Sequence, residues 1–159
     1  MLAAGAATRF GSPKQRLLLP HVLAALRQSS VDEIVVVTGA HEVDTDARVV
    51  ACEEWEQGPG ASLRSGLVAV SHKVEAAVVV LADGPSLDPR AVDRVIEAWS
   101  EGAGDRLAAT YDGVNRSHPV LIARAAWSEI PDDGARRLAV TLVPCDDLTD
   151  PGDVDNLEG

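Results

Sequence analysis

The first fourteen positions gather glycine and positive charge in an arrangement that suits phosphate binding. Gly5 and Gly11 flank Arg9, and Lys14 follows shortly after. Glycine permits positive φ and close backbone approach, so such a loop can direct several N–H groups at a phosphate. Arg9 and Lys14 add the charge that a polyphosphate needs. The stretch matches neither GxxxxGK[ST] nor GxGxxG, and an ordinary glycine-containing turn between a strand and a helix stays an alternative.

A carboxylate follows a second apolar run. In VVVLADGPSL, residues 78–87, the hydrophobic residues lead to Asp83, and Gly84-Pro85 then turns the chain. A carboxylate at the carboxyl end of a strand is well placed to hold Mg²⁺, with substrate phosphates completing the coordination shell. The alternative is an aspartate that only forms a turn or caps a helix.

A third candidate site lies where residues 58–60, Gly-Pro-Gly, lead into a predicted helix. The N–H groups from Ala61 to Leu63 would be unpaired within that helix. Such a helix start can bind an anion or the edge of a base. A capped helix without a ligand explains the same residues.

Two further groups of polar residues lie in the second half of the chain. Asp150, Asp153 and Asp155 could deliver a second metal ligand, although a solvated acidic tail is the simpler interpretation of them. His118 stands immediately before Pro119 and a short apolar run. A lone histidine is more often structural than catalytic, so contact with a substrate is here one of two hypotheses.

These candidate sites need strands and helices to position them. The continuous, β-branched runs predict strands that are covered on both faces. They are Leu2–Ala4, Ile34–Thr38, Ala77–Ala82 and Val140–Val143, with Val120–Ile122 as a shorter candidate. Apolar residues at helical spacing predict helices over 88–99, 61–70, His21–Arg27 and Gly134–Ala139. In the helix over 88–99, Asp88 is the expected N-cap and Pro89 the first helical residue.

The alternation of strands and helices predicts an α/β sandwich around a mostly parallel sheet. Ligands bind such sheets beyond the carboxyl ends of the strands. Residues 102–104, Gly-Ala-Gly, are expected to form an ordinary loop between a helix and a strand.

Composition limits the function further. The 159 residues carry a formal net charge of −11 and are 46% hydrophobic, which predicts one folded domain over 1–159. The acidic surface argues against a DNA or RNA partner, and the apolar runs are too short to span a membrane. Cys52 and Cys145 lack CxxC or Cys/His spacing, which predicts reduced thiols and a cytoplasmic location.

Five segments, taken in order, resemble one family. LAAGAATRFGSPK is similar to the LAAGxxxRxGxxK signature of the MobA-like nucleotidyltransferases, and most similar to the molybdenum cofactor cytidylyltransferase branch. GASLRSGL resembles the family's Ser-Leu-Arg-x-Gly-Leu segment, and LADGPSL resembles its LADQP element. SHPVL is similar to GHPVL, and DVDNLE to the terminal DIDTPED.

The resemblance implies a three-layer α/β/α sandwich with a Rossmann-like, mostly parallel mixed sheet of the nucleotide-diphospho-sugar transferase type. It also implies an enzyme that transfers a nucleoside monophosphate from an NTP to a phosphorylated acceptor and releases pyrophosphate. In this branch the transferred group is CMP from CTP and the acceptor is the molybdopterin cofactor. The implied metal is Mg²⁺, with Mn²⁺ as an alternative.

The resemblance also assigns roles to residues of this chain. The nucleotide would contact Leu2, Ala3, Ala4, Gly5, Arg9, Lys14, Ser62 and Asp83. Arg9 and Lys14 would neutralise the triphosphate and act in catalysis together with Asp83. Asp83 would bind the metal, with Asp153 as its second ligand and Asp155 as the alternative. His118 would contact the acceptor.

Several positions depart from the family pattern. The usual Gln after the metal-binding Asp is Gly84, the usual Gly before His-Pro is Ser117, and the usual Thr of the last motif is Asn156. AHEVDTDARVV is expected to be too short for the usual helix and strand. A shortened loop is expected after Leu19, and part of the first strand is expected to precede Met1.

These departures leave the substrate open. The preference for CTP depends on Ala4, because its methyl group would leave less room for a purine than glycine. The alternatives are a transferase for another acceptor, such as a sugar phosphate or phospholactate, and a non-catalytic accessory protein that delivers a cofactor to a molybdoenzyme.

Overall fold

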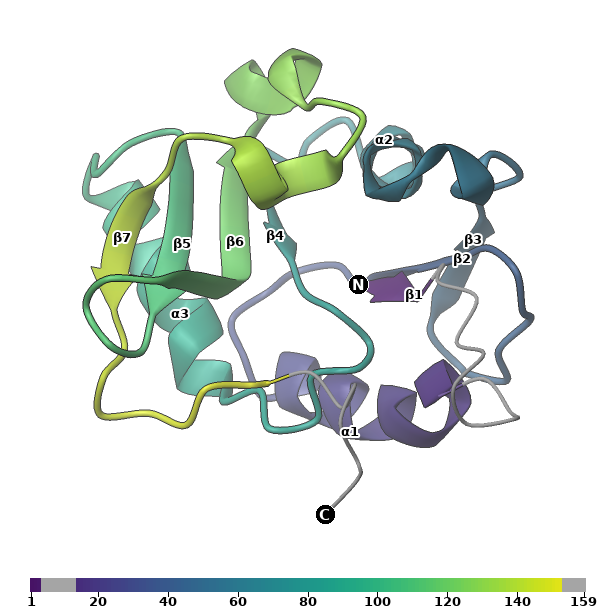
Figure 1. Cartoon of the computed structure of the whole chain (residues 1–159), viewed down its shortest axis with the longest axis horizontal. Helices are drawn as coiled ribbons and strands as arrows, with labels where there is room; N and C mark the ends of the chain where they lie inside the picture. The colour runs from purple at the N-terminus through teal and green to yellow at the C-terminus, as the bar shows by residue number, and fades with distance from the viewer. Residues whose placement is uncertain (4–13, 153–159) are drawn as a thin grey trace.

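The computed structural model describes residues 1–3 and 14–152, and for residues 14–17 it describes the course of the backbone. Strands and helices alternate along most of the chain, as expected, but in two places one strand follows another with no helix between them (Figure 1). The strands are β1 (Leu2–Ala3), β2 (Val35–Thr38), β3 (Arg48–Ala51), β4 (Ala76–Val79), β5 (Arg106–Thr110), β6 (Arg116–Ala123) and β7 (Thr141–Pro144). The α-helices are α1 (Lys14–Arg27), α2 (Pro59–Ala69) and α3 (Pro89–Ser100), and the 3₁₀ helices are η2 (Trp55–Gln57), η3 (Arg124–Glu129) and η4 (Gly134–Arg137).

The strands form two groups that meet at β1. One group has the order β1-β2-β3 and is parallel, and the other has the order β4-β6-β5-β7. The Leu2 N–H donates to Val80 O at 2.9 Å, and the Ala82 N–H donates to Leu2 O at 3.0 Å, which joins the groups just beyond β4. Within the described ranges, β6 is the one strand that runs antiparallel to its neighbours. The expected mostly parallel mixed sheet is confirmed.

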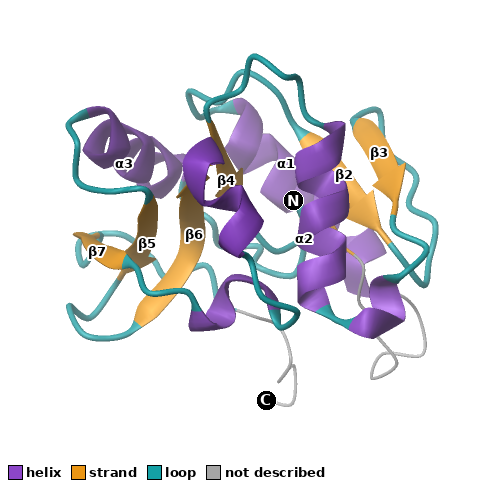
Figure 2. Ribbon diagram, turned by 90° about the horizontal axis from the view of Figure 1, so that it is seen from above, coloured by secondary structure: helices purple, strands orange, loops and turns teal. Residues whose placement is uncertain are grey.

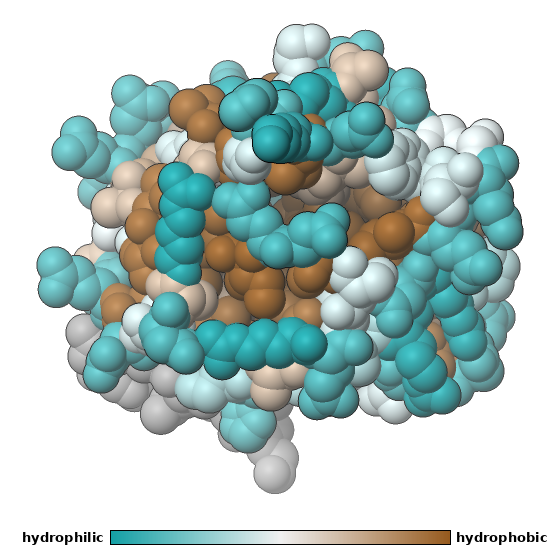
Figure 3. Space-filling model, turned by 180° about the vertical axis from the view of Figure 1, so that it is seen from behind, coloured by the Kyte–Doolittle hydropathy of each residue, from teal (hydrophilic) through white to brown (hydrophobic). Residues whose placement is uncertain are grey.

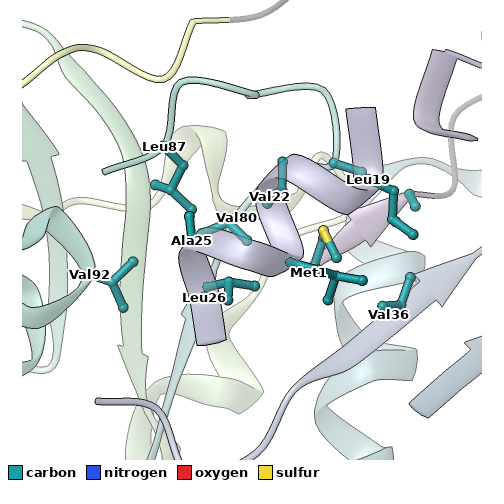
Figure 4. Close-up of a cluster of buried hydrophobic side chains, with 12 residues drawn as sticks. Met1, Leu19, Val22, Ala25, Leu26, Val36, Val80, Leu87 and Val92 are labelled. Carbon is teal, nitrogen blue, oxygen red and sulfur yellow. The ribbon is translucent and has the colours of Figure 1, made fainter. Parts of the chain in front are cut away.

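Helices cover both faces of the sheet (Figure 2). On one face α1 and α3 contribute the core, where Val22 and Leu26 of α1 pack with Val36 and Val80 and with Val92 of α3 (Figure 4). On the other face Leu63 and Leu67 of α2 pack in a cluster with residues of β4, β6, η3 and the segment around η4. The arrangement is therefore the expected α/β/α sandwich.

Local signals explain two of the helices. The side chain of Asp88 accepts a hydrogen bond from the Arg90 N–H at 2.9 Å, and Pro89 is the first residue of α3, so the predicted cap is confirmed. Helix α1 runs through Pro20 and is longer than the His21–Arg27 helix that was expected. The apolar residues before Pro20 therefore belong to the same helix as those after it.

The structure corrects several boundaries. Strands β3 and β5 were not predicted, and AHEVDTDARVV does provide a strand, β3, although no helix precedes it there. Three of the four residues of β3 are exposed, so the segment lacks the buried apolar pattern on which the strand predictions depended. The expected helix over Gly134–Ala139 is the short 3₁₀ helix η4, and β6 extends well beyond Val120–Ile122. The loop over 102–104 is confirmed, since α3 ends at Ser100 and β5 begins at Arg106.

A cavity of about 480 Å³ lies between β2 and β4 at the end of the sheet where these strands begin, here called the amino edge. Mostly apolar side chains line it, among them Val35, Leu67, Val78, Trp99 and Leu121. In the space-filling view from behind, hydrophobic side chains are visible in the middle of the molecule, framed by hydrophilic ones (Figure 3). No helix in the described ranges is long and apolar enough to cross a membrane.

Candidate functional site

The opposite end of the sheet, here called the carboxyl edge, brings Asp83 close to the end of β1. Leu2 pairs with Leu81, two residues before Asp83, through the bonds that join the two strand groups. β1 ends at Ala3, which is buried, and the chain then enters the glycine-containing stretch predicted to bind phosphate. The strand that delivers the carboxylate and the strand that leads into the predicted phosphate loop are therefore direct neighbours.

The chain passes beside Asp83 a second time, just before its tail. A Cβ on Gly84 would lie 3.2 Å from Gly152 O and 3.3 Å from the Cβ of Pro151. Glycine at position 84, where the family has Gln, leaves this space for Pro151 and Gly152. The segment leading toward the predicted ligand Asp153 therefore runs alongside the turn that carries Asp83.

His118 lies in an irregular part of β6. Ala108 pairs with Val120, and the next residue of β5, Ala109, pairs with Ser117, so the His118–Pro119 pair has no partner on β5 and forms a bulge. The peptide bond between these two residues is cis. The Tyr111 hydroxyl donates to the His118 carbonyl at 2.8 Å and holds the bulge. Bulges redirect side chains and are over-represented beside active sites.

Charge and burial act together on His118. Burial lowers the pKa of His118, while nearby Asp83 and Asp150 raise it in part and Arg116 lowers it further. The imidazole is therefore uncharged at neutral pH. Asp150 accepts hydrogen bonds from the Ser117 hydroxyl at 3.4 Å and from the Gly152 N–H at 2.9 Å. Asp83, His118 and Asp150 thus converge at the carboxyl edge from three distant parts of the chain.

The start of α2 packs against a later segment of the chain. Ser62 is buried, and the Gly60 N–H donates to Asp132 O at 2.9 Å. This bond occupies one of the N–H groups in the first turn of α2, directly before the three that were predicted to face a ligand. The contact of Ser62 with a base and ribose stays a prediction.

Two residues of this region were not found from the sequence. Tyr111 holds the bulge at His118, and Arg116 donates to backbone carbonyls of the segment that contains η4. Tyr111 is the one tyrosine of the chain, which is a weak signal, and nothing local distinguishes Arg116 from the other arginines.

The predicted ligands for a metal and for the triphosphate are described only in part. Asp83 lies in the described ranges, whereas Ala4, Gly5, Arg9, Asp153 and Asp155 lie outside them. Lys14 begins α1, and its side chain also lies outside the description. Within residues 1–3 and 14–152 no three His, Cys, Asp or Glu side chains are grouped so that they could hold a metal. Asp83 offers the oxygen donors that Mg²⁺ and Mn²⁺ prefer, and further donors would come from residues outside these ranges or from substrate.

The sequence of the chain matches a family model over most of its length. Residues 1–143 match the MobA-like NTP transferase domain. The chain belongs to this family. A comparison with curated proteins gives no match.

Solved structures share the fold of this chain. The structure of Rv0371c from Mycobacterium tuberculosis H37Rv is 27% identical, with a TM-score of 0.71 over 90% of this chain and 85% of that one. A structure of the same protein in complex with manganese is 24% identical, with a TM-score of 0.66 over 90% and 83% of the two chains. Molybdopterin-guanine dinucleotide biosynthesis protein A from Archaeoglobus fulgidus is 18% identical, with a TM-score of 0.64 over 92% and 82%.

Together these findings define a coarse activity. The MobA-like NTP transferase family consists of nucleotidyltransferases, which use an NTP and a phosphorylated acceptor. The family and the fold were both correctly predicted from the order of the five motifs.

Proposed function

We propose that the chain transfers CMP from CTP to a phosphorylated acceptor, the molybdopterin cofactor, and releases pyrophosphate. The convergence of Asp83, His118 and Asp150 beside the end of β1 carries this proposal. An oxygen of the acceptor phosphate attacks the α-phosphorus, forming a new P–O bond. The bond from the α-phosphorus to the bridging oxygen breaks, and its electron pair leaves with pyrophosphate. The acceptor phosphate is already ionised, so this step needs no general base.

The nucleotide half of the site must align the triphosphate and balance its charge. Arg9 and Lys14 neutralise the leaving pyrophosphate, while the backbone of residues 2–5 and the buried Ser62 border the nucleoside. Asp83, together with Asp153, would hold a divalent cation. When bound, Mg²⁺ or Mn²⁺ supplies positive charge to the phosphate oxygens and orients them, and the manganese complex of Rv0371c supports this choice of ion.

The acceptor half is built on β6 and the segment after β7. The uncharged imidazole of His118 donates a hydrogen bond to the acceptor, because its neutral form keeps one N–H. Asp150 fixes the Ser117 hydroxyl, and Tyr111 fixes the backbone of His118. These bonds give the acceptor half a defined shape before the substrate arrives, which lowers the cost of alignment.

Replacement of Asp83 tests the assignment. We expect Asp83→Asn to reduce pyrophosphate release by about 100-fold or more, with a melting temperature close to that of the wild type. Asp46→Asn is the matched control, because Asp46 is an exposed carboxylate that pairs with Arg27 away from the carboxyl edge. Near-full turnover by Asp83→Asn would show that the metal assignment is wrong.

A substrate screen tests the nucleotide and the acceptor. Pyrophosphate release is measured with each of the four NTPs and with Mg²⁺ or Mn²⁺. The acceptor is molybdopterin, a sugar phosphate, phospholactate or none. Release that requires both CTP and molybdopterin supports the proposal, and a clear preference for GTP contradicts the role given to Ala4. Release only with a sugar phosphate or phospholactate would show that the chain is a nucleotidyltransferase for that acceptor and not for molybdopterin. Binding of pterin without any release would favour an accessory protein that serves a molybdoenzyme.

The proposed compartment is the cytoplasm. Cys52 and Cys145 are both buried and free, which suits a reducing environment. No nucleic-acid or membrane partner is included in the proposal, since the chain is acidic and its ligands are small phosphorylated molecules.

A further inference from the structure

The side chain of Arg116, the first residue of β6, donates hydrogen bonds to backbone carbonyl groups of a later segment. Its Nη2 donates to Ala135 O at 2.7 Å, and its Nη1 donates to Leu138 O. Burial lowers the pKa of Arg116, but an arginine stays protonated at physiological pH. Because the guanidinium is a rigid planar fork, two carbonyls held by it are fixed relative to β6 and to each other.

The segment that Arg116 holds, residues 130–138, is called here the bracing segment. It reaches the first turns of α2, where Asp132 O accepts from the Gly60 N–H at 2.9 Å. Arg64 of α2 donates to Ile130 O at 3.1 Å and to the Asp132 carboxylate at 3.2 Å. The approach is close, since a Cβ on Gly60 would lie 2.3 Å from the carbonyl oxygen of Pro131.

Apolar packing supports the same connection. Ile130 and Leu138, at the two ends of the bracing segment, are both buried in one cluster. This cluster also contains Leu63 of α2 and Val120 of β6. The bracing segment is therefore anchored on both sides, to the strand that carries His118 and to the helix that carries Ser62.

We propose that the bracing segment sets the spacing between the two halves of the site, and that Arg116 is a positioning residue for nucleotide transfer. The inference rests on the proposed function, in which His118 faces the acceptor and Ser62 borders the nucleotide. Arg116 stands two residues before His118, yet its bonds lead to the start of α2. Loss of Arg116 should therefore disturb binding of the nucleotide, although the residue belongs to the acceptor half.

Amide hydrogen exchange tests the structural connection between Arg116 and α2, and it requires no enzymatic assay. In Arg116→Met we expect the Gly60 amide, which is bonded to Asp132 O, to exchange about tenfold faster than in the wild type. The matched control is Arg124→Met, at the residue that directly follows the other end of β6. Arg124 also donates to two carbonyls, Val74 O at 2.6 Å and Ser71 O at 3.0 Å, but these lie at the amino edge.

Equal protection of the Gly60 amide in Arg116→Met and in the wild type would overturn the proposal that Arg116 acts on α2 through the bracing segment. Faster exchange in both arginine variants would show general loosening and would also overturn it. Only a change confined to Arg116→Met supports a specific connection between β6 and α2.

Kinetics test the positioning role. We expect Arg116→Met to raise KM for the nucleotide and to lower kcat/KM by about tenfold or more, with little change in KM for the acceptor. Arg116→Lys should fall between Met and the wild type, because one ammonium cannot reproduce the two-pronged contact. An increase confined to the acceptor KM would contradict the proposal.

A second variant keeps the test decisive if Arg116→Met is unstable. Arg64→Met removes the bonds between α2 and the bracing segment, so it should also raise KM for the nucleotide. In the double variant Arg116→Met/Arg64→Met, the loss of kcat/KM, expressed as free energy, should be smaller than the sum of the two single losses. The reason is that both residues act through one segment. Additive effects would contradict this. If the wild type releases no pyrophosphate at all, the transfer proposal fails, while the exchange comparison still decides whether Arg116 holds α2.

Discussion

The two edges of the sheet carry different kinds of feature. The amino edge has a cavity of about 480 Å³ with mostly aliphatic walls from β2, β4 and α2. The carboxyl edge has Asp83, His118 and Asp150, which come from three distant segments. A small-molecule site needs a few converging polar groups as well as space. The proposed reaction site is therefore at the carboxyl edge and not in this cavity.

The difference follows from how parallel strands end. Loops leave the sheet at the carboxyl edge, and polar residues placed there meet without interrupting the core. At the amino edge, strand residues such as Val35 and Val78 line the cavity together with helix and loop residues, and most of the lining side chains are apolar. We therefore expect substitution of a cavity-lining side chain to alter stability without altering turnover, and substitution of the polar side chains at the carboxyl edge to alter turnover.

The largest expected loss of stability is at the cavity. Leu121 is fully buried in β6 and lines the cavity, so Leu121→Ala should lower the free energy of unfolding by about 2–5 kcal/mol. Denaturant unfolding measures this loss. Pyrophosphate release per folded molecule should stay close to the wild-type value. If Leu121→Ala kept its stability but lost turnover, the cavity would take part in the reaction, and the contrast between the two edges would be wrong.

A smaller effect is expected where α2 meets the bracing segment. In Gly60→Ala the new methyl group would collide with the carbonyl oxygens of Pro131 and Asp132, so we expect a loss of about 1–3 kcal/mol. Gly66→Ala in the same helix is the control. There the nearest atom is a side-chain methyl group of Val37 at 2.8 Å, and Val37 lines the cavity.

Thermal melts of the two glycine variants should therefore differ. At position 66 the gain in helix propensity, about 0.5–1 kcal/mol, offsets the contact with Val37. Equal losses in both variants would mean that the carboxyl-edge contact is no tighter than the amino-edge one.

The smallest expected effect concerns pH. The folded-state pKa of His118 lies below its ordinary value of 6.5, so the unfolded chain takes up a proton first as the pH falls. In the metal-free protein His118 should therefore lower stability as the pH falls below about 6.5. His118→Gln should flatten this part of the curve, as measured by the melting temperature between pH 7 and pH 5. An unchanged slope would show that the imidazole is not shielded from water.

Much of the scaffold was predictable from local patterns. The continuous apolar runs located β2, β4 and β7 to within a few residues, and Asp88 with Pro89 located the start of α3. These signals work because burial and capping leave traces in neighbouring residues. The edge strand β3 left no such trace, since most of its side chains are exposed.

The amino-acid sequence by itself determined most of the alternation of strands and helices, the family, and the position of Asp83 after an apolar strand. Tertiary structure decided which residues meet: Asp150 with Ser117, Gly60 with Asp132, and Arg116 with the bracing segment. It also placed His118 in a bulge, which depends on the register between β5 and β6. These contacts join residues far apart in the chain, and only the packing of the whole sheet brings them within hydrogen-bond distance.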